Sequence, residues 1–131
     1  MASESRHISE YIDRTAADVY AYASDPANLP NWAPGLGTTV EKVDGQWFVQ
    51  TPEGRAAFGF AAPNDFGVLD HSVALPSGEV MYVPMRVIAD GKVSEVVFTL
   101  RRRPGMTDDE FARDAELVAA DLARLRQVLT Y

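Results

Sequence analysis

A dense series of turn signals between residues 36 and 103 constrains the fold of this chain most strongly. Asp44-Gly45 and Asp90-Gly91 are dipeptides typical of two-residue β-hairpin loops. Slightly longer turns are predicted at residues 51–54, 63–65 and 76–78, which are rich in Pro, Gly, Asn and Asp. Because short connections join antiparallel neighbours, we expect an antiparallel meander. Its six predicted strands lie at about 37–43, 46–51, 55–62, 66–75, 79–89 and 92–102.

A seventh strand and two short helices are predicted before this meander. The strand covers about residues 6–12. The segment Thr15-Ala16-Ala17-Asp18 resembles a capping box, and it predicts a short helix that ends near Ala23. Asp25-Pro26 then starts a second short helical turn with proline at its favoured first position, and this turn ends near Trp32.

A long C-terminal helix follows the meander. Thr107-Asp108-Asp109-Glu110 is a full capping box. The apolar residues that follow recur at spacings of four and three: Phe111, Ala115, Val118, Leu122, Leu125 and Leu129. This stripe predicts an amphipathic helix with one buried face. Seven strands and this helix together indicate an α+β fold.

The composition limits the classes of function. A chain of 131 residues, 47% hydrophobic and 24% charged, has the size and balance of one soluble globular domain. The absence of cysteine excludes disulfides, thiol catalysis and cysteine-based metal sites. A net charge of −7 argues against binding to nucleic acid or anionic membranes, which requires a basic surface. Since neither an apolar span nor a signal-peptide pattern is present, we expect a cytoplasmic protein.

The hairpin loops also predict which residues face each other across the strands. The Asp90-Gly91 loop places Arg86 opposite Glu95 and Val83 opposite Phe98. The loop at 76–78 places His71 opposite Val83, and the hairpin closed through 64–65 places His71 opposite Phe58. One face then collects Phe58, Phe60, Leu69, His71, Val73, Met81, Val83, Met85, Val96, Phe98 and Leu100. The other face collects Asp70, Ser72, Tyr82, Arg86, Glu95 and Thr99.

This division separates Asp70 from His71, although they are adjacent in the sequence. Neighbouring residues of a strand point to opposite faces, so the two cannot form a hydrogen-bonded catalytic pair. We expect Asp70 to join Arg86 and Glu95 in a surface ionic cluster worth about 0–1 kcal/mol per pair. His71 is then the only ionisable side chain on the apolar face of these strands.

Further polar groups are placed by extending the register. Through the turn at 51–54, Phe48 and Gln50 fall on the apolar face, with Glu41 beside them. Glu10 points inward if its neighbours Ile8 and Ile12 do. For both glutamates a position at the solvated rim is the alternative.

Residues 15–32, TAADVYAYASDPANLPNW, resemble the signature of the bacterial polyketide cyclase/dehydrase-like branch of the SRPBCC proteins, in the START/Bet v 1-like superfamily. In that branch a helix, a D-P step and a tryptophan follow the first strand. The resemblance implies one domain over residues 1–131 with the helix-grip fold. In this fold a seven-stranded curved antiparallel sheet, with two short helices after its first strand, wraps around the long C-terminal helix.

The resemblance also implies a ligand site. Members bind lipids, sterols, quinones, polyketides and aromatic compounds in a cavity beneath the C-terminal helix, and some catalyse reactions. The concave sheet face lines that cavity, and Trp32 would lie near its mouth. The ligand-binding residues expected here are Trp32, Phe48, Phe58, Phe60, Leu69, His71, Met81, Val83, Met85 and Phe98.

Three functions remain open. The first is binding of an apolar small molecule without a metal or other cofactor, since two histidines and no cysteine give too few good metal ligands. The second is a cyclase- or dehydratase-type enzyme, in which partly desolvated His71 acts as the catalytic acid or base. The third is a module whose groove takes a lipid or protein partner. A pocket histidine that does no chemistry is the alternative to catalysis.

Overall fold

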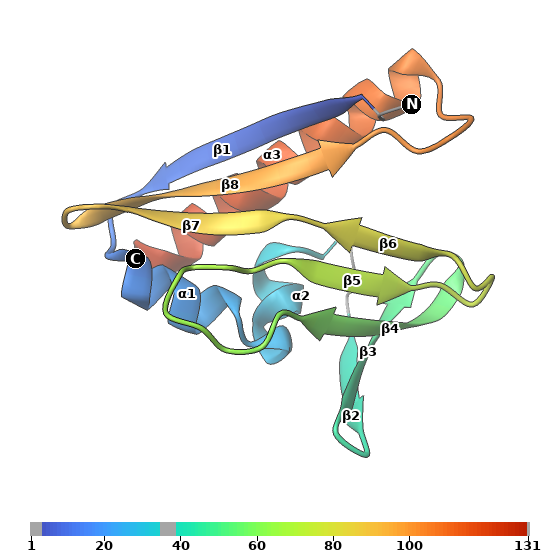
Figure 1. Cartoon of the computed structure of the whole chain (residues 1–131), viewed down its shortest axis with the longest axis horizontal. Coiled ribbons are helices and arrows are strands. Elements are labelled where there is room, and N and C mark those ends of the chain that lie inside the picture. The colour runs from blue at the N-terminus through green and yellow to red at the C-terminus, as the bar shows by residue number, and fades with distance from the viewer. Residues whose placement is uncertain (1–3, 35–38, 131) are drawn as a thin grey trace.

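The computed structural model describes residues 4–34 and 39–130 (Figure 1). In these ranges the chain forms eight strands, three α-helices and one 3₁₀ turn. The order is β1 (Ser5–Ile12), α1 (Ala16–Ala23), η1 (Pro26–Asn28), α2 (Leu29–Trp32), β2 (Val40–Val43), β3 (Gln46–Thr51), β4 (Gly54–Phe60), β5 (His71–Ala74), β6 (Val80–Val83), β7 (Met85–Asp90), β8 (Val93–Arg101) and α3 (Asp108–Leu129). Residues 37–38 of the predicted second strand lie outside the described residues.

The strands form a curved antiparallel arrangement of two hydrogen-bonded sheets. One has the order β1-β8-β7 and the other the order β2-β3-β4-β5-β6. They adjoin where the chain passes from β6 to β7 through Pro84, which has no N–H to give to a ladder. The single strand predicted at 79–89 is therefore two strands, and the described chain has eight rather than seven. The predicted strand 66–75 is regular only in β5, preceded by an isolated bridge between Val68 and Arg86.

The helix α3 confirms its predicted pattern. The Thr107 hydroxyl accepts a hydrogen bond from the Glu110 N–H, and the Glu110 carboxylate accepts one from the Thr107 N–H. The helix runs along β1 and β8 in Figure 1. Its buried side chains are Phe111, Leu122, Leu125 and Leu129. It lacks the length of apolar sequence that a membrane span needs, as do the other helices of the described residues.

Two arginines attach α3 to the rest of the fold. Arg126 Nη1 lies 2.8 Å from Glu10 Oε1 of β1. Arg124 Nη1 donates to the Trp32 carbonyl oxygen at 3.2 Å, which joins α3 to α2. Thr15 caps α1 as predicted, since its side chain accepts from the Asp18 N–H, and Asp25 caps η1 by accepting from the Ala27 N–H. The contact between Arg126 and Glu10 shows that α3 covers the face of β1 that carries Ile8, Glu10 and Ile12.

Two predicted registers differ from the structure by two residues. The β7–β8 loop is Gly91-Lys92, closed by Asp90 and Val93, and Gly91 has φ +63°. Glycine at the first loop position is typical of a type II′ turn. Arg86 therefore lies opposite Val97 rather than Glu95, and Phe98 lies opposite Met85 rather than Val83.

The second such register is that of β4 and β5, where His71 lies opposite Phe60 rather than Phe58. The pairing of His71 with Val83 across β5 and β6 is confirmed. Because side chains alternate with a period of two, a shift of two residues leaves every side chain on its predicted face.

The β3–β4 register reverses one predicted face. Thr51 pairs with Gly54, so Trp47 lies opposite Phe58 and Phe48 lies opposite Ala57. The prediction that Phe48 and Gln50 share the apolar face with Phe58 is wrong, because an offset of one residue exchanges the two faces. On the outer face the guanidinium of Arg55 lies 3.9 Å from the centroid of the Phe48 ring.

Candidate functional site

A continuous inward face runs across both sheets, and α3 packs against the part of it that β1 and β8 form. Across β1, β8 and β7, Ile8 pairs with Phe98, which pairs with Met85. Across β6, β5 and β4, Val83 pairs with His71, which pairs with Phe60. The backbone N–H of Leu69 donates to the Met85 carbonyl at 2.9 Å, which joins the two rows. This face, which we call the inner face, has His71 near its centre.

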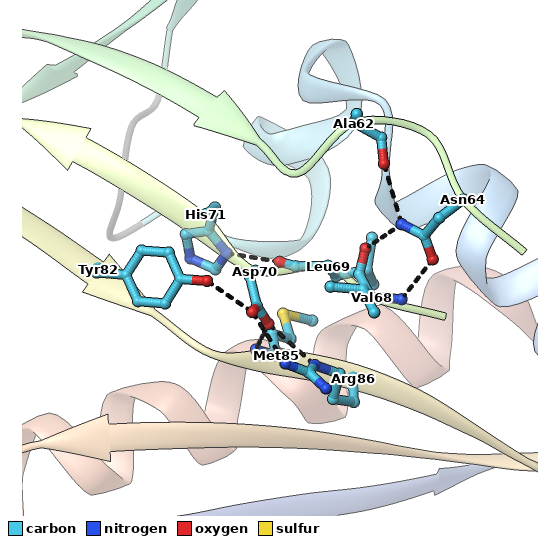
Figure 2. Close-up of polar contacts among 9 residues, drawn as sticks. All are labelled: Ala62, Asn64, Val68, Leu69, Asp70, His71, Tyr82, Met85 and Arg86. Atoms are coloured by element: carbon cyan, nitrogen blue, oxygen red, sulfur yellow. Dashed lines mark hydrogen bonds and ion pairs between the residues drawn. The ribbon is translucent and has the colours of Figure 1, made fainter. Parts of the chain in front are cut away.

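His71 is enclosed by aromatic rings. Its side chain is 6% exposed. The imidazole centroid lies 5.4 Å from the ring of Phe58, 5.5 Å from Phe60 and 6.1 Å from Phe98. Its Nδ1 atom lies 3.0 Å from the carbonyl oxygen of Leu69 (Figure 2). Burial lowers the pKa of His71 below its usual value, since the charged imidazolium loses more hydration than the neutral ring; the Leu69 carbonyl opposes this effect.

Asp70 points to the opposite face and is buried, which corrects the predicted surface cluster. Its side-chain oxygens accept four hydrogen bonds, from the Tyr82 hydroxyl at 2.7 Å, the Met85 N–H at 2.9 Å, and Arg86 Nε and Nη2 at 3.0 Å each (Figure 2). The residue is only 7% exposed. Glu95 does not take part, because it pairs with Ile88.

This network lowers the pKa of Asp70. The hydrogen bonds from Arg86 favour the ionised carboxylate and, with those from Tyr82 and Met85, outweigh the cost of burial. They lower the pKa of Asp70 to about 2. Asp70 therefore holds the start of β5 against β6 and β7 where Pro84 interrupts the ladder. Its role in the described structure is to fix the backbone that carries His71.

The Asp70 carboxylate also explains why His71 can bond to Leu69. Residues directly opposite in an antiparallel ladder can exchange two backbone hydrogen bonds. Between Leu69 and Met85 only one is made, from the Leu69 N–H to the Met85 carbonyl. The Met85 N–H goes to Asp70 instead, and the Leu69 carbonyl takes His71 Nδ1. Asp70 and His71 are thus linked through the Leu69–Met85 pair, although their side chains do not meet.

Asn64 organises the loop that leads into β5. Its Oδ1 accepts from the N–H groups of Phe66 and Val68, and its Nδ2 donates to the carbonyls of Ala62 and Val68, all at 3.0 Å. Figure 2 shows the contacts of this amide with Ala62 and Val68. The Asn64 N–H donates to the Tyr20 hydroxyl of α1 at 3.0 Å. These hydrogen bonds hold the loop in one conformation and attach it to α1.

The expected ligand-binding residues fall into three groups. Phe48 lies on the outer face. Trp32, Phe58, Leu69 and Met85 are at most 3% exposed and belong to the core. The inward residues that keep partial exposure are Phe60, Met81, Val83 and Phe98.

Trp47 was missed by the sequence analysis. It shares the inner face with Phe58 and is partly exposed. The sequence of residues 51–54 contained the signal, since proline at the second position and glycine at the fourth are typical of a type I turn. Taking the first and fourth residues of that turn as the closing pair places Trp47 inward.

Trp32, expected near the mouth of a cavity, is 3% exposed. It packs in the core, and its Nε1–H is buried without a hydrogen-bond partner among residues 4–34 and 39–130. Two surface pockets occur elsewhere. One, of about 370 Å³, lies between the end of β1 and the end of α3, and the other, of about 350 Å³, lies between α1 and the loop at Phe66. Neither includes an expected ligand-binding residue.

Three further acidic groups differ in their surroundings. Glu10 faces α3 and pairs with Arg126, whereas Glu41 is exposed and lies 3.9 Å from Arg55. Burial raises the pKa of Asp121, on α3, to about 6 although Arg124 Nη1 lies 3.1 Å away. Within the part of the chain that is described, His, Asp and Glu side chains do not gather in groups of three that could hold a metal ion.

Comparisons with known proteins identify the fold. No family model matches the chain, and a search of curated proteins finds no match. Among solved structures, the protein XoxI from Bacillus cereus has a TM-score of 0.73 and 15% identity, with 98% of this chain and 96% of that one covered. DynU16, from the dynemicin biosynthetic locus, has a TM-score of 0.70 and 13% identity; 95% of this chain covers 46% of that protein.

A plant enzyme has the same fold. The structure of norcoclaurine synthase from Thalictrum flavum in complex with dopamine and hydroxybenzaldehyde has a TM-score of 0.60 and 18% identity, with coverage of 97% and 86%. At this level of identity the likeness shows a shared architecture, in which a curved antiparallel sheet is combined with a long C-terminal helix.

Proposed function

We propose that this chain is a single-domain member of the START/Bet v 1-like superfamily that binds a hydrophobic small molecule. The ligand, a lipid, polyketide, quinone or aromatic compound, would lie between the inner face of the sheet and α3. The observation that carries the proposal is a group of five partly exposed apolar side chains on the inner face. Phe60, Val83 and Phe98 adjoin His71, Met81 lies opposite Val73, and Trp47 lies opposite Phe58.

The distribution of exposure supports a site rather than a simple core. The hydrophobic core is closed around Phe58, Leu69 and Met85, which are at most 1% exposed. The five residues next to them on the inner face retain contact with solvent although they are apolar. Leaving such surface exposed costs about 25 cal/mol per Å², and a ligand that covers it recovers this free energy. The thioether of Met81 can adapt to ligands of different shape.

The shared fold adds a second line of support. The norcoclaurine synthase structure contains two small aromatic compounds, and the resemblance of residues 15–32 implies a superfamily of hydrophobic-ligand binders. The proposal for this chain rests on its own inner face, because the identities of 13–18% do not carry a ligand from one protein to another.

Ligand binding is tested by thermal denaturation and calorimetry with a panel of naphthalene derivatives, a fatty acid, a quinone and a polyphenol. A ligand at ten times its Kd adds about 1.4 kcal/mol to the free energy of unfolding, which raises Tm by about 4 °C in a domain of this size. Burial of apolar surface should also give a negative heat-capacity change of binding.

Two neighbouring substitutions show where the ligand lies. Met81→Glu puts a charge on the inner face and should abolish binding. Val80→Glu is the matched control, since Val80 adjoins Met81 in β6 and is 61% exposed on the other face. If no compound of the panel binds at millimolar concentration, or if both variants bind alike, the proposed site is wrong.

Catalysis is a second candidate function. A histidine with a lowered pKa is neutral near pH 7, and a neutral imidazole is the form that accepts a proton. In a cyclase- or dehydratase-type reaction His71 would be that base. With a substrate in hand, His71→Gln should remove turnover and leave binding within a few-fold, and turnover that survives the change excludes His71 as the base.

A further inference from the structure

The hydrogen bond of His71 determines which of its ring nitrogens carries the proton. A carbonyl oxygen can only accept a hydrogen bond, so the contact of 3.0 Å with the Leu69 carbonyl requires Nδ1 to be the donor. In a neutral imidazole one nitrogen is protonated and the other is not. Nε2 of the neutral ring therefore carries a lone pair and can only accept.

This acceptor has no partner in the described structure. Among residues 4–34 and 39–130, no hydrogen bond reaches His71 Nε2. The atoms that are both unpartnered and completely enclosed there are Trp32 Nε1 and Ser94 Oγ, so Nε2 keeps some access to the surface. A polar atom in apolar surroundings is costly unless it finds a partner. The inner face thus presents one unsatisfied acceptor among hydrophobic side chains.

The groups around this acceptor select for a flat ligand. The rings of Phe60 and Phe98 lie 5.5 and 6.1 Å from the imidazole and meet it at angles of 75° and 58°. Edge-to-face and tilted contacts of this kind are favourable between aromatic groups. Both phenylalanines are partly exposed, as is Trp47 of the same face. An aromatic ring beside His71 would extend this arrangement.

On the basis of the proposed function, we propose that the ligand is a neutral aromatic alcohol, whose hydroxyl donates a hydrogen bond to His71 Nε2 while its ring lies against Phe60 and Phe98. A hydrocarbon of the same shape leaves the acceptor unpaired. A carboxylate can bond to Nε2 only if the buried imidazole first takes up a proton, which its burial opposes. The chain's net charge of −7 also disfavours an anion. His71 is then a specificity residue that recognises a hydroxyl group.

The test compares 2-naphthol with 2-methylnaphthalene, which has a methyl group in place of the hydroxyl, and with 2-naphthoate, which is ionised at pH 7. Calorimetry on the full chain should show naphthol binding about 10- to 100-fold more tightly than either analogue, the range expected when a buried hydrogen-bonding group is left unpaired. In His71→Phe, which keeps a flat ring without an acceptor, the preference for naphthol over methylnaphthalene should fall below about threefold.

Each outcome decides between the two proposals. If methylnaphthalene binds the native protein as tightly as naphthol, the hydroxyl inference is wrong and the hydrophobic site stands. If none of the three compounds binds, the inference of an aromatic alcohol is wrong, and the fatty acid, quinone and polyphenol of the panel then decide whether the hydrophobic site exists. Nitrogen NMR of histidine in the native protein gives an answer that does not depend on a variant folding. The inference requires a protonated Nδ1 and an unprotonated Nε2 whose signal moves when naphthol is added. A protonated Nε2 at pH 7 would overturn it.

Discussion

The buried carboxylate of Asp70 supports a quantitative prediction for Asp70→Asn. The pKa of this group is about 2 in the folded protein and 3.8 in an unfolded chain, a difference that contributes about 2.4 kcal/mol to the free energy of unfolding at pH 7. Asparagine keeps the shape and an acceptor for the Met85 N–H, but it removes the charge that bonds to Arg86. We therefore expect the substitution to cost about 2 kcal/mol at pH 7.

The pH dependence follows from the same values. Because the pKa is lowered on folding, the contribution is fully present above pH 4 and is lost as the pH falls toward 2. It should decrease to about 1.3 kcal/mol at pH 3. The free energy lost in Asp70→Asn should therefore be about half as large at pH 3 as at pH 7. This difference distinguishes a charged hydrogen-bond network from a loss of packing, which would not vary with pH.

Urea unfolding followed by circular dichroism at pH 7 and pH 3 measures both quantities. Asp13→Asn is the control, because Asp13 is exposed and a surface substitution of this kind changes stability by less than about 0.5 kcal/mol. If Asp70→Asn costs no more than this control at pH 7, the carboxylate is a surface charge, as the sequence alone suggested. An equal loss at both pH values would also refute the electrostatic account.

Two further predictions concern backbone approach and a helix carboxylate. Gly67 has φ +71°, and a Cβ there would clash with the Val87 carbonyl oxygen, so Gly67→Ala should cost at least about 2 kcal/mol by urea unfolding. Gly105→Ala, where φ is +81° and the space is open, should cost about 1 kcal/mol. Burial raises the pKa of Asp121 from 3.8 to about 6. Its ionisation therefore lowers the free energy of unfolding as the pH rises from 4 to 6. Asp121→Asn should therefore be more stable than the parent at pH 7, by about 1–3 kcal/mol, and equal to it at pH 4; equal stability at both pH values would contradict the raised pKa.

Local patterns predicted the helices because their causes are local. The capping box at Thr107 and Glu110 involves residues three apart, and both of its hydrogen bonds are present. The single apolar stripe of α3 packs against one surface, the inner face of β1. Short-range rules of this kind do not depend on how distant strands pair, which is why they held.

Hairpin registers were predicted less well, because a Gly-containing pair does not show which of two loops will form. At Asp44-Gly45 both residues have positive φ, 51° and 82°, and the predicted two-residue loop is confirmed. At Asp90-Gly91 the glycine occupies the first loop position instead, which shifts the register by two residues. The composition of the inner face survived this error, whereas the one-residue error at 51–54 exchanged Trp47 for Phe48.

The burial of Asp70 could not be predicted from alternation, which correctly placed it on the polar face. It is buried because Pro84 interrupts the strand opposite, and the free N–H of Met85 then requires an acceptor in that gap. Proline in a predicted central strand was the available signal, since it cannot donate to a ladder. Asp70 does bond to Arg86, as predicted, but its carboxylate is buried and holds neighbouring strands together instead of lying on the surface.

Asp70 and His71 are adjacent in the sequence and are coupled through backbone hydrogen bonds rather than through their side chains. Alternation sends the two side chains to opposite faces, so no direct hydrogen bond joins them. Asp70 takes the N–H of Met85, the Leu69 carbonyl is left to accept from His71 Nδ1, and this bond sets the lone pair on Nε2. A carboxylate on the outer face thus determines, through one unpaired step of the backbone ladder, which ring nitrogen of His71 remains an acceptor on the inner face.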